Sequence, residues 1–169
     1  MKSGENLSAG SKPIFKKILV AIDGSESAKR AARDAVGLAE KFHADLVVLH
    51  AILPPGTHYG SNYPTLSGVS PPPISQREID SYYEYNKKVA NSMIDETARD
   101  AKKLGIKVKT EIIEGASSIV ETIINHADDE HADLIVVGTR GLGGFKKLLI
   151  GSVSSGVISH ANCPVLIVR

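Results

Sequence analysis

The chain has 169 residues, 42% of them hydrophobic and 23% charged, and a formal net charge of +1. This length and composition are typical of one globular domain, and the near-zero charge excludes binding of nucleic acid through bulk positive charge. No window approaches the roughly 18 consecutive apolar residues of a membrane span, and the polar start lacks a signal-peptide region. We therefore expect a cytoplasmic protein with neither membrane nor nucleic-acid partners, with a flexible tail over residues 1–13 and a single domain over 14–169.

The first predicted elements are a strand, a helix and a second strand. Residues 17–22 (KILVAI) form a short apolar run that ends in a turn and helix-cap signal, Asp23-Gly24-Ser25. Residues 25–43 carry apolar side chains at i, i+3 and i+4 spacing, which indicates a helix with one face on a sheet. Residues 46–51 (LVVLHA) are again apolar throughout. Strands that are apolar on both faces indicate a parallel sheet with helices on each side.

A long loop and a long helix follow. Residues 54–73 are rich in Pro, Gly, Ser and Tyr without periodicity, which indicates either a loose insertion or a functional lid. Ser75 and Glu78 form a capping-box signal that opens a helix ending near Gly105. Its predicted apolar stripe includes Val89, Leu104 and the tyrosine pair 82–83, which we expect in the core or an interface.

Three further strands and two helices complete the chain. Residues 106–113 alternate at first and predict a third strand nearer an edge. Ser118 and Glu121 form a second capping-box signal for a helix. Residues 134–138 predict a strand, 152–161 a helix and 164–168 the last strand. This alternation predicts the α/β class, with a parallel sheet and right-handed crossovers.

The stretch 132–155 joins an apolar strand to a glycine-rich basic loop and a helix start. Its glycines let backbone N–H groups approach a ligand without interference from a Cβ atom, and the free N–H groups of the following helix favour negative charge. No acidic residue follows Asp133, whereas four basic residues do: Arg140, Lys146, Lys147 and Arg169. The sequence therefore predicts an anion-binding loop.

The spacing within this loop resembles that of a known family. Gly138 and Gly141, followed after nine residues by Gly151 and Ser152, match the G-x2-G-x9-G-[ST] signature of the ATP-binding branch of the universal stress protein family. The segments KILVAIDGSESAKRAARDAVGLA, DLVVLHAI and ANCPVLIVR are also similar to its first strand and helix, second strand and final strand. The resemblance covers residues 16–169, apart from the length of the 54–73 loop.

The resemblance implies the strand order, which periodicity alone does not give. The expected fold is a Rossmann-like, doubly wound five-stranded parallel sheet of order 3-2-1-4-5 with helices on both faces. Two segments, Asp23 and the loop after 138, would then meet across the point where the winding reverses. Many family members are homodimers, so the resemblance also implies pairing through the last strand, Pro164 to Val168.

The resemblance further implies a site for ATP or another adenine nucleotide, with Mg²⁺ on the phosphates. Ala21 and Asp23 would lie against the adenosine, and Ala51 would meet the adenine through its backbone. The remaining expected site residues are Val137 and Gly138 over the base and ribose, Arg140 in the loop, and Gly141, Gly151, Ser152, Val153 and Ser154 around the phosphates. The Ser152 and Ser154 hydroxyls can donate to phosphate oxygens. Asp23 also has a second interpretation as a helix cap, and the serines as ordinary helix-start residues.

Other chemistries find little support in the sequence. No G-x4-G-K-[ST] motif, no G-x-S-x-G elbow and no metal-ligand spacing of histidines occurs, and Cys163 is a lone cysteine with no motif partner. No carboxylate lies in the glycine loop to orient an attacking water. We therefore predict a non-enzymatic module for stress response or signalling, with slow or no hydrolysis, whose nucleotide alters its surface for an unidentified protein partner. Two alternatives stay open: an ATP hydrolase or nucleotidyl-transfer enzyme on the same fold, and an interaction protein with a vacant site.

Overall fold

The computed structural model describes residues 14–55, 74–141 and 150–169. Strands and helices alternate along these ranges in the order β1 (Lys17–Ala21), α1 (Glu26–Phe42), β2 (Asp45–Ile52), α2 (Gln76–Lys103), β3 (Val108–Glu114), α3 (Ile119–Asp129), β4 (Leu134–Gly138), α4 (Ser152–His160) and β5 (Val165–Val168). The predicted tail 1–13, residues 56–73 of the predicted 54–73 loop, and the loop lysines 146 and 147 lie outside the described residues.

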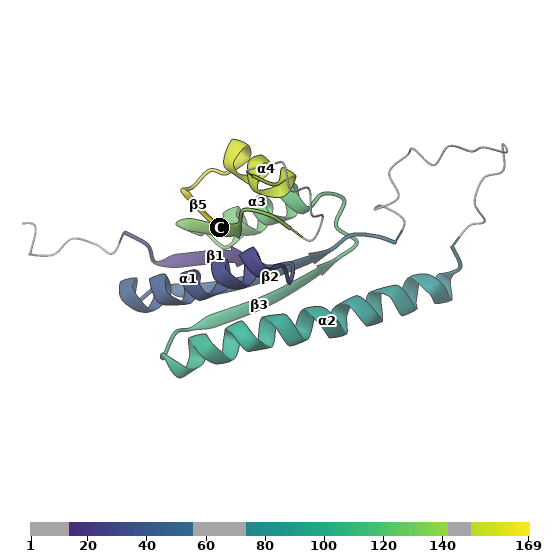
Figure 1. Cartoon of the computed structure of the whole chain (residues 1–169), viewed down its shortest axis with the longest axis horizontal. Coiled ribbons are helices and arrows are strands. Elements are labelled where there is room, and N and C mark those ends of the chain that lie inside the picture. Colours follow the sequence, from purple (N-terminus) through teal and green to yellow (C-terminus); the bar gives the residue numbers. More distant parts are fainter. Residues whose placement is uncertain (1–13, 56–73, 142–149) are drawn as a thin grey trace, which may run out of the picture.

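The five strands form one parallel sheet in the order β3-β2-β1-β4-β5 (Figure 1). The predicted fold class and strand order are thus confirmed. The chain winds from β1 outward to β3, then crosses to β4 on the other side of β1. The carboxyl ends of β1 and β4 therefore border the crevice where an open α/β sheet binds its ligand.

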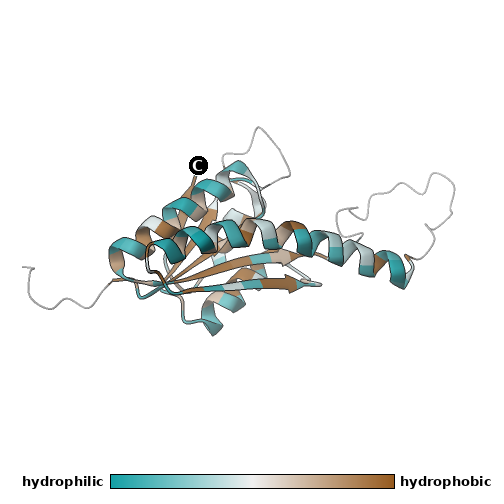
Figure 2. Cartoon of the chain, turned by 90° about the horizontal axis from the view of Figure 1, so that it is seen from below, coloured by the Kyte–Doolittle hydropathy of each residue, from teal (hydrophilic) through white to brown (hydrophobic). Residues whose placement is uncertain are grey.

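Helices cover both faces of the sheet, as predicted. The side chains of Ile18 and Val20 pack in one buried cluster with α1 and α2, whereas Leu19 packs in a second cluster with α3 and α4. This alternation along β1 follows from the two-residue period of a strand. Figure 1 shows α3 and α4 on the opposite side of the sheet from α2, and Figure 2 shows mostly hydrophobic strands beneath helices with hydrophilic outer faces.

Serine side chains begin three of the helices. Ser25 accepts a hydrogen bond from the backbone N–H of Ala28, and the capping box predicted at Ser75 and Glu78 is formed in both directions. Ser118 caps α3 by accepting from the Glu121 N–H, which is one half of the second predicted box. None of the described helices combines the length and apolar character needed to cross a bilayer.

Helix α2 is longer than the sheet beneath it. Its buried residues all lie in its C-terminal part: Ala90, Ile94, Thr97, Ala98 and Ala101. The N-terminal part projects past the carboxyl edge of the sheet (Figure 1). Val89 and Leu104 were predicted to face inward, but they are 42% and 47% exposed, because Val89 lies beside the buried stripe and Leu104 is the C-cap residue.

Strand β3 begins two residues later than predicted. Ile106 is buried in the cluster of α1 and α2, and its N–H donates to the Ala101 carbonyl oxygen at 3.1 Å. It thus closes the end of α2 before the chain enters the sheet at Val108. The apolar character of Ile106 reflects this loop packing, which a strand pattern does not distinguish.

Candidate functional site

A cavity of about 740 Å³ opens at the carboxyl edge of the sheet. Its walls come from the ends of β1, β2 and β4, from the first turn of α4, and from α2 and α3. The structure brings all eleven predicted site residues together here: Ala21, Asp23, Ala51, Val137, Gly138, Arg140, Gly141, Gly151, Ser152, Val153 and Ser154. Parallel strands direct their carboxyl ends to one edge, so residues distant in sequence meet there.

Asp23 faces the start of the glycine-rich loop across this crevice. Its Oδ1 accepts a hydrogen bond from the Ser25 N–H at 3.0 Å. Its Oδ2 lies 2.7 Å from the position that a Cβ atom would take at Gly141, so a side chain at Gly141 would require the carboxylate to move. The N-cap of α1 is Ser25, which leaves the second carboxylate oxygen of Asp23 beside the cavity instead of in the helix cap.

A hydrogen-bonded clamp joins the start of α1 to the exit of β4. The hydroxyls of Ser25 and Ser27 donate to the Arg140 carbonyl oxygen at 3.0 and 2.5 Å. A Cβ atom at Gly138 would stand 2.6 Å from the Ser27 Oγ and 2.8 Å from the Ala28 nitrogen, so the absence of a side chain at Gly138 permits this approach. The clamp fixes the entry of the loop beside Asp23.

The first turn of α4 presents backbone donors to the cavity. Gly151 is its N-cap residue and supplies no side-chain hydrogen bond. The Gly151 N–H donates to the Thr139 carbonyl oxygen at 2.6 Å, and the Ser155 N–H begins the intrahelical pattern by donating to Gly151 at 2.9 Å. The N–H groups of residues 152–154 therefore have no acceptor among the described residues. They lie at the N-terminus of α4, which is the positive end of the helix dipole.

The two serines of this turn differ in what they offer. The Ser154 hydroxyl donates to the Gly138 carbonyl oxygen at 2.6 Å, and its side chain is buried. It therefore holds α4 against the end of β4, and only its backbone N–H remains for a ligand, contrary to the expectation of a free hydroxyl. Ser152 is exposed and lines the cavity. Its hydroxyl has no hydrogen-bond partner among the described residues.

Sequence reasoning missed several residues that line the cavity. Ile119 and Ile123 of α3 supply an apolar wall, and Tyr82 and Asn86 come from the projecting part of α2. The tyrosine was expected in the core or an interface, but it lines the cavity. The i, i+4 spacing of Tyr82 and Asn86 places both on one helix face, which was the available signal.

Charged and nucleophilic groups are sparse around the cavity. Among the described lining residues, Asp23 is the only carboxylate and Arg140 the only Lys or Arg side chain. Burial, followed by the nearby charge of Asp128, raises the pKa of the Cys163 thiol, which is not among the lining residues. No group of three or more His, Cys, Asp or Glu residues within the described ranges is arranged to hold a metal ion.

The sequence over residues 14–169 matches the family model described as the universal stress protein family. The chain belongs to this family. A universal stress protein of Bacillus subtilis, YxiE, is 35% identical over 156 residues, which cover 92% of this chain and all of the relative. The universal stress protein MJ0531 of Methanocaldococcus jannaschii is 31% identical over 173 residues, covering all of this chain and 86% of the relative.

Solved structures of universal stress proteins share the fold. UspA from Lactobacillus plantarum is 26% identical with a TM-score of 0.68, and the match covers 92% of this chain and 98% of that one. A universal stress protein solved in complex with cAMP is 25% identical with a TM-score of 0.60, covering 92% and 97%. An Arabidopsis thaliana family member solved with AMP bound is 19% identical with a TM-score of 0.61, covering 90% of each chain. That last match establishes likeness of fold alone.

Proposed function

We propose that this universal stress protein binds an adenine nucleotide, with ATP as the expected ligand, in the cavity at the carboxyl edge of the sheet. The observation that carries the proposal is the uncapped first turn of α4, which opens into the same cavity as Asp23 and Gly141. Backbone N–H groups at a helix N-terminus are suited to phosphate oxygens. The family member solved with cAMP supports an adenine nucleotide as the ligand class.

The cavity offers a different kind of contact to each part of the ligand. The phosphates would accept from the N–H groups of residues 152–154 beside Gly151, with Arg140 adding positive charge. The second carboxylate oxygen of Asp23, which has no hydrogen-bond partner among the described residues, would accept from the ribose hydroxyls, as acidic residues do in dinucleotide-binding folds. The apolar side chains of Val137 and Ile123 would pack against the sugar and base.

In this proposal Mg²⁺ is coordinated by the phosphates and not by a complete set of protein ligands. Magnesium commonly keeps several waters and binds through substrate phosphates with one or two carboxylates. Asp23 is the one carboxylate among the described residues that line the cavity, which is too few for a dedicated protein site. The affinity for ATP is therefore expected to rise with Mg²⁺, whereas the affinity for AMP is expected to change little.

Hydrolysis is expected to be slow or absent. An attacking water needs a general base within hydrogen-bond reach. Asp23 uses one oxygen to accept from Ser25 and lies at the Gly141 end of the crevice, where the proposal assigns it to the ribose. No other carboxylate among the described lining residues could take the role of the base.

The proposed role is therefore to signal and not to catalyse. A bound nucleotide would change the surface around α4, and a protein partner in the cytoplasm would recognise that change.

The proposal includes a homodimer formed through β5. This strand pairs with β4 on one side only and lies at the sheet edge. The carbonyls of Pro164 and Val168 accept from β4, so the alternation of a parallel ladder directs the peptide groups of Ile167 outward. A second copy would satisfy these groups and cover the apolar edge.

Light scattering at micromolar concentration tests the dimer. Wild-type protein is expected at twice the chain mass of 18.0 kDa. Ile167→Pro removes an outward-facing N–H without removing a bond to β4, so it is expected to give a folded monomer. A monomeric wild-type mass contradicts the dimer, and a folded Ile167→Pro variant that remains dimeric contradicts pairing through β5. Circular dichroism verifies the fold.

Isothermal titration tests the nucleotide site. Wild-type protein is titrated with ATP, ADP and AMP, each with and without Mg²⁺, and with GTP for comparison. One site per chain with a micromolar dissociation constant for ATP is expected. The absence of binding by any adenine nucleotide at millimolar concentration contradicts the proposal, and turnover of ATP well above one per minute contradicts its non-enzymatic part.

A further inference from the structure

The two ends of the cavity are chemically different. One end is the first turn of α4, with backbone donors and no side-chain cap. The other end is bordered by Ala51 of β2, by Leu53 immediately after this strand, and by α2. Two strand spacings, roughly 10 Å, separate β4 from β2 across β1. A nucleotide held by its phosphates at α4 therefore directs its base toward β2 and α2.

Tyr82 and Asn86 line this second end from the projecting part of α2. They lie one helical turn apart, and both are half-buried. The Tyr82 ring meets the Tyr83 ring edge to face, with centroids 5.6 Å apart and planes at 75°. The Tyr83 hydroxyl in turn lies near Gly115 in the turn after β3, 3.5 Å from the position that a Cβ atom would take there. Tyr83 thus lies between the Tyr82 ring and the turn after β3.

A hydrogen bond fixes the orientation of the Asn86 amide. Its Nδ2 donates to the Tyr82 carbonyl oxygen at 2.8 Å. Because a carbonyl oxygen only accepts, the amino group must face the helix and the Oδ1 atom must face away from it. No described residue donates to that Oδ1. Asn86 therefore offers the cavity an oriented hydrogen-bond acceptor that a ligand donor can satisfy.

We propose that Tyr82 and Asn86 form the base-recognition wall of the site. This inference rests on the proposed nucleotide function and assigns its base selectivity to α2. The Tyr82 ring packs against the purine, and the Asn86 Oδ1 accepts from the exocyclic 6-amino group of adenine. A 6-oxo purine presents an acceptor at that position, which leaves two oxygens facing each other without a proton.

AMP and IMP differ at the 6-position of the base and therefore test the role of Asn86. In isothermal titration, wild-type protein is expected to bind AMP at least about tenfold more tightly than IMP. Asn86→Leu conserves the approximate size but removes the acceptor, so the preference is expected to fall to within about threefold through weaker AMP binding. Asn91→Leu is the matched control, because Asn91 is an exposed residue of the same helix, and it should keep the wild-type ratio.

The outcomes separate this inference from the function on which it rests. If wild-type protein binds no adenine nucleotide, ATP included, the proposed function is wrong and this inference falls with it. If wild-type protein binds AMP and Asn86→Leu keeps the same AMP-to-IMP ratio, the role of Asn86 is wrong while the nucleotide site stands. A wild-type protein that binds AMP and IMP equally also overturns the role of Asn86.

Tyr82 is tested by its effect on both nucleotides. Tyr82→Ala is expected to weaken AMP and IMP alike by about fivefold or more, because packing against a base does not depend on its 6-substituent. Tyr82→Phe keeps the ring and should retain wild-type affinity. Tyr85→Ala, at a residue of the same helix that is 70% exposed, is the control and should change neither affinity. Unchanged binding by Tyr82→Ala overturns the packing role of the ring.

Discussion

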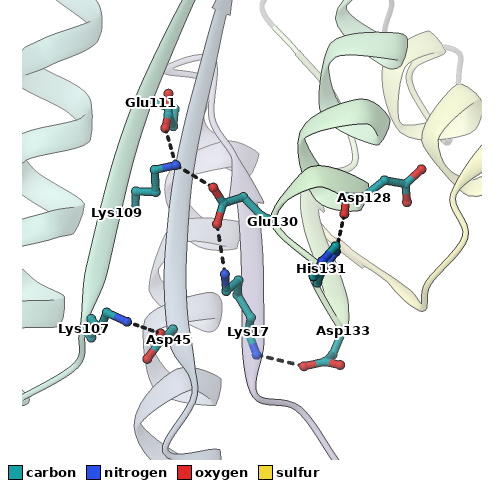
Figure 3. A network of polar contacts seen from close by, with 9 residues as sticks. All are labelled: Lys17, Asp45, Lys107, Lys109, Glu111, Asp128, Glu130, His131 and Asp133. Carbon is teal, nitrogen blue, oxygen red and sulfur yellow. Dashed lines mark hydrogen bonds and ion pairs between the residues drawn. The ribbon is translucent and has the colours of Figure 1, made fainter.

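The two edges of the parallel sheet satisfy their polar groups in opposite ways. At the carboxyl edge, glycines keep side chains out of a cavity, and the first-turn N–H groups of α4 have no acceptor among the described residues. At the amino edge, charged side chains from the starts of neighbouring strands pair with one another (Figure 3). The first arrangement leaves hydrogen-bonding capacity for a ligand, whereas the second uses it within the chain.

Glu130 is the centre of the amino-edge network. It accepts from Lys109 at 2.5 Å and from Lys17 at 3.0 Å, and Lys109 also pairs with Glu111 at 2.8 Å. The hydrogen bond from Lys109, followed by that from Lys17, lowers the pKa of Glu130 to about 2. The hydrogen bond to Glu111, followed by that to Glu130, raises the pKa of Lys109. These pairs connect β1, β3 and the turn before β4.

A neighbouring carboxylate completes this edge through the backbone. Asp133 Oδ2 accepts from the N–H groups of Lys16 and Lys17 at 2.7 and 2.9 Å, and Lys107 pairs with Asp45 at 2.9 Å. In the proposed account, ligand binding is assigned to the carboxyl edge, and the ion pairs at the amino edge contribute to stability. Substitutions at the carboxyl edge should change ligand affinity, and substitutions at the amino edge should change stability alone.

The largest expected effect is that of Gly151→Val. A Cβ atom at this position would stand 3.1 Å from the Thr139 oxygen, and the added methyl groups would enter the space proposed for the phosphates. Its φ of −74° and ψ of 164° suit valine, so the fold should persist. ATP affinity in isothermal titration is expected to fall at least about tenfold, which corresponds to about 1.4 kcal/mol. Unchanged ATP affinity in a folded variant would show that the first turn of α4 does not bind the phosphates.

The next effect is that of Asp23→Asn. Asparagine can still accept from the Ser25 N–H through Oδ1, so the turn should remain intact while the charge is lost. ATP affinity is expected to fall by about fivefold, since hydrogen bonds to charged groups are stronger than those to neutral groups. A ligand without ribose hydroxyls, 2′,3′-dideoxy-ATP, should bind the variant and the wild type equally. An equal loss for both ligands contradicts the ribose contact.

Glu130→Gln tests the amino edge by denaturation. Because the pKa of folded Glu130 lies below its ordinary value of 4.5, its stabilising contribution is complete above pH 4.5 and is lost as the pH falls toward about 2. At pH 7 the variant is expected to be less stable by no more than about 1 kcal/mol, since the Lys109 side chain is exposed and that of Lys17 is only half-buried. The two proteins should converge near pH 2. Their ATP affinities at pH 7 should be equal, and a loss of ATP binding would contradict the separation of the edges.

The smallest effect is expected from Gly37→Ala on α1. Gly37 is exposed within the helix, and a Cβ atom there would meet nothing within 4 Å. Alanine should therefore stabilise the chain by about 0.5 kcal/mol, measured by urea denaturation, through its better helix propensity. ATP binding should not change, which makes this variant the glycine control for Gly151→Val. A loss of affinity in this variant would show that a glycine substitution far from the cavity can change ATP binding, and Gly151→Val would then no longer identify α4 as part of the site.

The sequence predicted the elements well because their signals are local. Apolar runs marked the strands, and serine caps such as Ser75 marked helix starts. The errors were limited to boundaries such as the start of β3 and to Val89 and Leu104, which were predicted to face inward but are exposed. The strand order required the family resemblance, since periodicity carries no information on which strands are neighbours. With that order, the convergence of Asp23 and Gly141 at one edge follows.

The missed features depend on distances that no local pattern contains. Helical periodicity gave the buried face of α2, but it did not show how far the helix extends past the sheet, so Tyr82 and Asn86 were not assigned to the cavity. The Ser154 hydroxyl could satisfy a ligand or a backbone carbonyl, and only the packing of α4 on β4 decides between them. Lys17 and Glu130 meet because the sheet brings together segments separated by more than a hundred residues.

A titration with ATP and Mg²⁺, followed by the amide resonances in two-dimensional NMR spectra, tests the separation of the two edges most directly. The amides of residues 151–154, together with those of Asp23 and Gly138, are expected to shift and saturate with one site per chain. The amides of Lys109, Glu130 and Asp133 should remain unchanged. Shifts confined to the amino edge, or no shifts at millimolar ATP, would contradict the assignment of binding to the carboxyl edge.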